Sequence, residues 1–468
     1  MAEGRWRVKP IEHLGDPGGG SALKRSLGPI HLTLIGVGSI VGTGIFVLTG
    51  IGAERAGPGL ILSFVIAGFV CAMAALAFAE LASMIPIAGS AYTYTYATLG
   101  ELAAWVVGWC LILEYAIAAS AVSVGWSGYV TGWMNGAGWE VPPVLTTGWF
   151  DGGIVNLPAI FIACVVTLLL VAGTRESAAV NAVLVVIKLA ALAVFVAVAA
   201  PHVDAVNYTP FLPHGFSGVL SAASLIFFAY LGFDAISTAG EETRNPNRDL
   251  PLGIIGSLLV CTLIYMVVAA VSVGALPFEK VMHSDEPLAH LVRTLGYGTA
   301  GDLVAAGAII TLPTVIMVMI YGQTRIFFAM ARDGLLPPVF ARVHGTRGTP
   351  HVVTLVTGAV IAVLAGLFPI EEITELSNAG TLLAFIVVAA AVVILRGTQP
   401  NRPRPFRCPA PLLVCGLAIL GCMVLFASLD VTTIVRFGAW VVIGIVVYYL
   451  YSGRRSPMRK PPEPNITP

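Results

Sequence analysis

The chain carries a succession of apolar segments, each long enough to form a helix that crosses a lipid bilayer. A transmembrane helix needs about 20 consecutive apolar residues. Runs of this kind are centred near residues 42, 70, 115, 163, 188, 229, 262, 315, 358, 385, 419 and 441. Only 11% of the 468 residues are charged, whereas a soluble globular domain carries roughly 25%. We therefore expect an all-α integral membrane protein with twelve transmembrane helices in the lipid bilayer.

Lysine and arginine residues predict how these helices are oriented, because they favour the cytoplasmic side of a membrane. With a cytoplasmic N-terminus, twenty of them fall in cytoplasmic segments and two, Lys280 and Arg293, fall in external loops. Residues 1–28 are therefore expected to form a cytoplasmic N-terminal arm, and residues 452–468 a cytoplasmic tail. The expected location is the plasma membrane, which is the inner membrane of a bacterial cell.

Composition and motifs argue against several other classes of protein. The formal net charge is zero, so no electrostatic feature favours a nucleic-acid partner. The seven cysteines are irregularly spaced, and we interpret them as buried thiols rather than as disulfides or metal ligands. The sequence has no phosphate-binding loop, no paired-histidine metal helix and no nucleophile–base pair. We expect no enzyme activity, no metal site and no cofactor, with protons as the coupling ion.

The first apolar segment contains an unusual concentration of glycine. Its centre, GVGSIVGTGIF from Gly36 to Phe46, has four glycines in eleven residues. Each of them costs about 1 kcal/mol relative to alanine inside a helix. Small residues let membrane helices approach one another closely, and glycines also occur where a helix is interrupted to form a binding site. This segment alone leaves both explanations open.

The sixth apolar segment, from Gly218 to Glu242, has an irregular centre at a similar depth. The stretch FFAYLGFD contains Gly232 and the acid Asp234. In both segments the irregular stretch lies about 14 residues from the start. Paired interruptions of this kind are typical of transporter binding sites. We therefore expect the first and sixth helices to be broken.

Five spans separate the starts of the two broken segments, so the second must cross the membrane in the opposite direction. The sequence therefore predicts a five-plus-five inverted repeat. The first repeat covers residues 29–200 (spans 1–5) and the second residues 216–396 (spans 6–10). Spans 11 and 12 follow in residues 411–451.

Two broken helices offer a suitable environment for a zwitterion. Backbone groups without partners are tolerated at membrane depth only where they line a cavity. The helix that restarts near Gly42 to Gly44 presents N–H groups and a positive dipole end, which favour a carboxylate. Carbonyl groups near Ile40 and near Phe228, Ala229 and Leu231 can accept hydrogen bonds from an ammonium group. An α-amino acid carries both groups on one carbon atom.

Four motifs carry a resemblance to a known family. They are GVGSIVGTGIF, AELASMIPIAGSAYTYTYATLGELAAWVVGW, FFAYLGFDAISTAGEETRNPNRDLP and GQTRIFFAMARDGLLPPVF. The chain resembles the amino acid–polyamine–organocation superfamily, and within it the twelve-span bacterial members of the cationic amino acid transporter family. The resemblance implies the inverted-repeat fold and uptake of amino acids by alternating access. It also implies substrate contacts from the following residues: Ile40, Gly42, Thr43, Gly44, Phe228, Ala229 and Leu231.

Lys188 lies in the middle of the fifth span, about 11 residues and ~16 Å from its cytoplasmic start. A charge at that depth is costly and suggests a functional role. In sodium-coupled relatives of this fold a cation bridges the first, fifth and eighth spans, and the resemblance suggests that the Lys188 ammonium replaces it in proton-coupled members. Thr311 or Thr314 is expected to contribute from the eighth span. The alternative is a structural lysine paired with carbonyl groups.

Three acids also lie within or at the ends of spans. Glu114 is expected either to line the pocket or a proton route, or to be satisfied by a neighbouring helix. Glu80 and Asp234 are interpreted as gating or structural acids. Phe228 is expected to act as a lid over the substrate, with a core aromatic as the alternative. The tyrosines of AYTYTYATLG fit an aromatic belt at the membrane interface.

The expected function is secondary active import of L-amino acids by proton symport with alternating access. An amino acid exchanger without proton coupling is the first alternative, and a membrane sensor that binds amino acids without transporting them is the second. The short arm and tail argue against the sensor. Because no acid clearly faces the side-chain end of the pocket, small neutral amino acids are expected at least as much as arginine. The sequence leaves accessory subunits open.

Overall fold

The computed structural model describes residues 9, 27–86, 89–173, 178–280, 284–342 and 350–453. These residues form an all-helical bundle without a β-strand; one isolated bridge joins Leu27 to Thr243. Eight helical segments are long and apolar enough to cross a membrane. Four further apolar helices, of 12 to 17 residues, are shorter. The chain is therefore a multi-pass membrane protein, and the count of twelve crossings remains a prediction.

Each predicted apolar segment is helical. The first half of the chain forms α1 (Pro29–Ile40), α2 (Thr43–Phe46), α3 (Leu48–Ala56), α4 (Leu60–Met84), α5 (Ser90–Thr98), α6 (Glu101–Gly136), α7 (Leu157–Ala172) and α8 (Ala178–Ala199). The second half forms α9 (Gly215–Ile226), η7 (Phe227–Tyr230), η8 (Asp234–Glu242), α10 (Pro246–Ala275), α11 (Pro287–Thr294), α12 (Gly298–Arg332), α13 (His351–Leu367), α14 (Ile370–Thr398), α15 (Pro411–Ala427) and α16 (Val431–Val447).

Both irregular segments are interrupted in the structure. The helix α1 ends at Ile40, Val41 and Gly42 are not helical, and α2 begins at Thr43. In the sixth segment, α9 continues as the 3₁₀ turn η7, after which Leu231 is extended and Gly232 has φ +115°. A side chain is strained at such a positive φ, which explains the glycine there.

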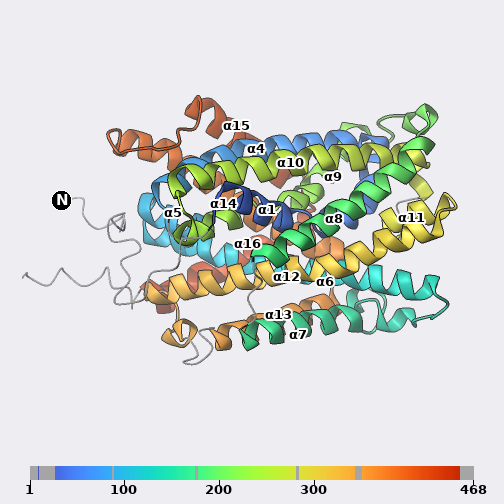
Figure 1. Cartoon of the computed structure of the whole chain (residues 1–468). Helices are drawn as coiled ribbons and strands as arrows, with labels where there is room; N and C mark the ends of the chain where they lie inside the picture. Colours follow the sequence, from blue (N-terminus) through green and yellow to red (C-terminus); the bar gives the residue numbers. More distant parts are fainter. Residues whose placement is uncertain are drawn as a thin grey trace, which may run out of the picture.

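Helices distant in sequence surround these interruptions. Figure 1 shows α1 inside the bundle, with α8 and α10 packed against it. The two longest helices, α6 and α12, pack along each other, and α6 also packs against α14. On one side of the bundle α7 pairs with α13. The broken segments are thus covered by unbroken helices, which removes the freed backbone groups from lipid.

Two expectations about side-chain environments are wrong. Tyr92, Tyr94 and Tyr96 do not form an interfacial belt, because α5 packs between α6 and α14 and all three rings are buried by protein. The Tyr92 hydroxyl donates to Asp333 at 2.8 Å instead of facing the membrane surface. The seven cysteines are free thiols, but Cys164 is exposed rather than buried.

Candidate functional site

A small cavity lies where the two interruptions meet. It is lined by Ser39, Ile40, Gly42, Thr43, Gly44, Val122, Phe228, Leu231, Val315 and Met319. Six of the seven substrate contacts expected from the sequence are among these residues, and Ala229 is the exception. Two unbroken helices, α6 and α12, contribute Val122, Val315 and Met319. No lining residue carries a charged side chain.

Three of the last four carbonyl groups of α1 have partners, one from the backbone and two from side chains of other helices. The last four carbonyl groups of a helix lack partners within the regular hydrogen-bond pattern. The Val37 carbonyl accepts from the Val41 N–H at 2.9 Å. The Gly38 carbonyl accepts from Lys188 Nζ at 2.6 Å, and the Ile40 carbonyl accepts from the Tyr265 hydroxyl at 2.8 Å. Side chains of α8 and α10 therefore cap the broken end of α1.

A second tyrosine contacts α2, the short helix that follows the break. Tyr129 of α6 is fully buried and donates to the carbonyl oxygen of Phe46 at 2.7 Å. Its ring packs edge-on against the Phe46 ring. Sequence reasoning missed both Tyr129 and Tyr265. The available signal was a tyrosine inside an apolar span, whose hydroxyl needs a hydrogen-bond partner when buried.

The glycines of the first segment have two different roles. A Cβ at Gly36 would overlap Ser257 of α10, and one at Gly38 would press on Val185 and Asn181 of α8. These two positions let helices approach closely, as the packing explanation requires. Gly42 and Gly44 instead lie at the break and line the cavity. Close helix packing therefore explains Gly36 and Gly38, and the interrupted helix at the cavity explains Gly42 and Gly44.

Gly44 also lies in close contact with the other broken segment. A Cβ at this position would overlap the Cα and the backbone nitrogen of Ala229. This contact explains why Ala229 is not among the cavity-lining residues: its backbone lies against Gly44. The absence of a side chain at Gly44 is thus needed for the packing of one break on the other.

Thr43 supplies a polar group at the cavity. It is 1% exposed, and its hydroxyl has no hydrogen-bond partner among the residues that the structure describes. A buried hydroxyl without a partner costs roughly 1–3 kcal/mol. The Ser39 hydroxyl, by contrast, donates to the Ile35 carbonyl at 2.8 Å. Thr43 is therefore the lining side chain best suited to bond a ligand.

Lys188 is fully buried within the protein. Its contact with the Gly38 carbonyl joins the fifth span to the first, as expected. The hydroxyl groups of Thr311 and Thr314 donate to carbonyl groups of their own helix, those of Gly307 and Thr311. A lysine at the C-terminal end of a helix also interacts favourably with the helix dipole. A role for Lys188 in coupling remains a prediction.

Glu114 and Asp234 lie in buried surroundings but do not line the cavity. The Tyr115 hydroxyl donates to Asp234 Oδ2 at 3.1 Å, which fixes this acid at the start of η8. Glu114 Oε2 has no hydrogen-bond partner within the described part of the chain. The backbone carbonyl of Glu114 accepts from Ser377 of α14 at 3.3 Å. A proton-carrying role for Glu114 remains a prediction.

Glu80 joins α4 to a distant loop. Its carboxylate, 1% exposed, accepts hydrogen bonds from Arg396 at 2.6 and 3.0 Å and from the Cys408 N–H at 2.7 Å. Arg404 lies 3.4 Å from the same carboxylate. These contacts attach residues 396–408 to the end of α4. The expected gating or structural role of Glu80 remains a prediction.

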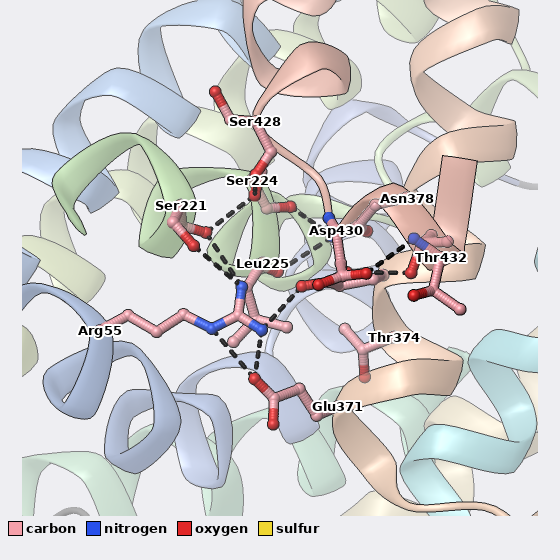
Figure 2. A network of polar contacts seen from close by, with 12 residues as sticks. Arg55, Ser221, Ser224, Leu225, Glu371, Thr374, Asn378, Ser428, Asp430 and Thr432 are labelled. Carbon is pink, nitrogen blue, oxygen red and sulfur yellow. Dashed lines mark hydrogen bonds and ion pairs between the residues drawn. The ribbon is translucent and has the colours of Figure 1, made fainter. Parts of the chain in front are cut away.

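A second polar network lies at the end of α3 (Figure 2). Arg55 bonds Glu371 of α14 and also contacts Ser221 of α9 and, at 2.7 Å, Glu375. The other carboxylate oxygen of Glu375 accepts from the Asp430 N–H and the Thr433 hydroxyl, at 3.2 and 3.0 Å. The network thus connects α3, which follows the first break, and α9, which precedes the second, with α14 and α16. Sequence reasoning did not identify it.

Two broken helices that meet at a cavity, inside a bundle of apolar helices, define a membrane protein of the transporter class. A family model described as "Amino acid permease" matches residues 27–449. The chain therefore belongs to the amino acid permease family of the amino acid–polyamine–organocation superfamily.

Individual relatives agree with this membership. The chain is 48% identical to the branched-chain amino acid permease BcaP of Bacillus subtilis (strain 168), over 97% of this chain and 99% of that protein. It is 42% identical to the methylthioribose transporter of the same organism, over the same shares of the two chains. It is 39% identical to cationic amino acid transporter 9, chloroplastic, of Arabidopsis thaliana, over 81% of this chain and 67% of that protein.

Proposed function

We propose that this protein imports neutral L-α-amino acids of small to medium size, branched-chain ones included, by proton symport. The observation that carries the proposal is the composition of the cavity. Backbone at Gly42 and Gly44 lines it together with six apolar side chains and no charged one. Such a site combines polar backbone groups for a zwitterion with an apolar surface for an aliphatic side chain.

The two charged groups of the substrate would be recognised by backbone atoms. N–H groups in the first turn after the break, together with the Thr43 hydroxyl, suit the carboxylate. Carbonyl groups at the end of α1 and at Phe228 suit the ammonium group. An arginine side chain would bring a positive charge among apolar side chains, which is costly without an acid to pair with.

The relatives point to different substrate classes. The similarity to cationic amino acid transporter 9 supports a cationic amino acid, which the uncharged lining of the cavity disfavours. The similarity to a branched-chain amino acid permease supports an aliphatic substrate. The similarity to a methylthioribose transporter supports a sugar that has neither ammonium nor carboxylate. Several sugar hydroxyl groups need several hydrogen-bond partners, but Ser39 and Thr43 are the only lining residues with a hydroxyl. The cavity therefore favours the amino acid.

Lys188 is the group proposed to couple transport to protons. Its Nζ donates to the Gly38 carbonyl, and an ammonium group is a stronger donor than a neutral amine. Loss of the proton would weaken the link between α8 and α1 and favour a second arrangement of the broken helix. Proton release and substrate release would then depend on one two-state element. An exchanger would not need this titratable group.

Uptake by purified protein in proteoliposomes tests the proposal. We expect an inward proton gradient to drive accumulation of isoleucine and alanine, and arginine and methylthioribose to compete poorly. Accumulation of methylthioribose but not of isoleucine would overturn the substrate class. Isoleucine uptake that requires internal amino acid and ignores the proton gradient would establish exchange instead.

A further inference from the structure

Tyr265 of α10 is held rigidly against the broken end of α1. It is fully buried, and its hydroxyl donates to the Ile40 carbonyl at 2.8 Å. Its ring makes edge-on contacts with Phe64 and Tyr230, at centroid distances of 5.7 and 5.4 Å. The position of the hydroxyl is therefore fixed by packing in the core.

The carbonyl that Tyr265 contacts belongs to a residue of the cavity. Ile40 is the last residue of α1 and lines the cavity. A carbonyl oxygen has two lone pairs, so one bond from Tyr265 leaves a second position for another donor. A hydrogen bond to the first lone pair restrains the peptide plane, so the second lone pair keeps a fixed direction.

We propose that Tyr265 is a positioning residue for the ammonium group of the substrate and that it acts through the Ile40 carbonyl. The substrate ammonium occupies the second lone pair of this oxygen, and Tyr265 does not touch the substrate. The proposal rests on the proposed function, because it needs a ligand with an ammonium group. Lys188 caps the neighbouring Gly38 carbonyl in the same way from α8.

The chain provides a matched control in the same aromatic cluster. Tyr230 is also fully buried, and its hydroxyl donates at 2.9 Å to the Phe64 carbonyl. Phe64 lies in the unbroken helix α4 and does not line the cavity. Tyr230→Phe and Tyr265→Phe therefore remove the same hydroxyl from similar surroundings, but only the second loses a contact with a cavity residue.

The experiment measures binding of three ligands by each purified variant. The ligands are isoleucine, 2-methylbutylamine, which keeps the ammonium, and 3-methylpentanoate, which keeps the carboxylate. We expect Tyr265→Phe to weaken isoleucine and the amine about tenfold, with the carboxylic acid unchanged. Tyr230→Phe should leave the affinities for all three ligands unchanged. Thermal unfolding confirms that both variants are folded.

Three results would overturn the positioning role. They are unchanged affinities in Tyr265→Phe, equal losses for all three ligands, and equal losses in the two variants. Unchanged affinities would show that the Tyr265 hydroxyl has no effect on binding. Equal losses for all ligands or in both variants would show that it affects only the structure. Failure of the wild-type protein to bind isoleucine would instead overturn the proposed function, so the two failures are distinguishable.

Discussion

Lys188 caps the broken end of α1. The burial of its side chain is therefore compatible with a structural role, as a cap, and with the proposed role in proton coupling. Its Nζ donates to the Gly38 carbonyl of α1. A lysine that stays protonated and a lysine that gains and loses its proton would make the same contact with Gly38. Only the second would make transport depend on a proton gradient. The distinction therefore has to come from a variant that keeps the length of the side chain and removes its proton.

Lys188→Met is expected to stop gradient-driven accumulation and to leave isoleucine binding weakened but measurable. Methionine fills the space of the lysine chain without a titratable group. The measurement is uptake with and without an inward proton gradient, and Lys280→Met, at an exposed position, is the control. Equal proton-driven accumulation by wild type and Lys188→Met would exclude Lys188 from coupling and direct attention to Glu114.

Gly44→Val is expected to abolish uptake while the protein still inserts into the membrane. The new side chain would meet the Ala229 backbone, which has no rotamer with which to yield. Transport assays with Gly416→Val serve as the control, because a Cβ at that position has no atom within 4 Å beyond its chain neighbours and the backbone of its own helix. Normal uptake by Gly44→Val would show that the two breaks need not lie in contact.

At the scale of single elements, a buried acid lies directly before the short helix α11. Glu286 precedes α11 and accepts a hydrogen bond from Arg293, which also bonds Asp302 of α12 at 3.0 Å. A Cβ on Gly132 of α6 would overlap the Glu286 carboxylate. Burial raises the pKa of the Glu286 carboxyl to about 7, the charges of Asp302 and Asp285 add to this, and Arg293 opposes it.

This acid predicts a pH-dependent stability. Native Glu286 keeps its proton up to about pH 7, whereas the unfolded carboxyl loses it near 4.5. The native state therefore gains stability from this group on acidification, and the gain is lost as the pH rises through about 7. We expect the unfolding midpoint of Glu286→Gln to vary less between pH 5 and 8 than that of wild type.

The control for this pH dependence is Glu279→Gln, which alters an exposed carboxylate of the same loop. Its unfolding midpoint should follow the wild-type pH profile. Burial also raises the pKa of Asp285, so part of the wild-type slope should survive in Glu286→Gln. An unchanged slope in Glu286→Gln would mean that Glu286 is ionised in the native protein throughout this range.

At the scale of the whole molecule, the network of Arg55 connects segments of both broken regions to the last helices of the bundle (Figure 2). Glu375 has a side chain that is only 3% exposed, and Arg55 is its ion-pair partner. Removing one member of a buried pair leaves an uncompensated charge. The network therefore couples the stability of α3, α9, α14 and α16.

Arg55→Met is expected to lower the free energy of unfolding by about 3–5 kcal/mol, because Glu375 loses its counter-ion. Thermal or denaturant unfolding of the purified protein measures this change. Arg436→Met is the matched control: it breaks an exposed pair with Glu372, on the same helix as Glu375, and should change stability by less than about 1 kcal/mol. Equal effects of the two substitutions would contradict the coupling.

The sequence by itself determined the helical membrane class, the position of both breaks and most of the cavity lining. These features depend on local properties: segment length, apolar composition, and glycines at or directly beside the interruptions, namely Gly42, Gly44 and Gly232. The depth of Lys188 indicated that it needs an acceptor, and the family resemblance placed that acceptor on the first span.

Only the tertiary structure decided which side chains complete the broken ends and which residues meet across the bundle. Tyr265 donates to the Ile40 carbonyl and Tyr129 to the Phe46 carbonyl because of where α10 and α6 pack against the first segment. No local sequence pattern encodes these positions. The burial of the α5 tyrosines and the partners of Arg55 have the same origin. Contacts between residues far apart in the sequence depend on how whole helices pack, and packing is a property of the assembled bundle.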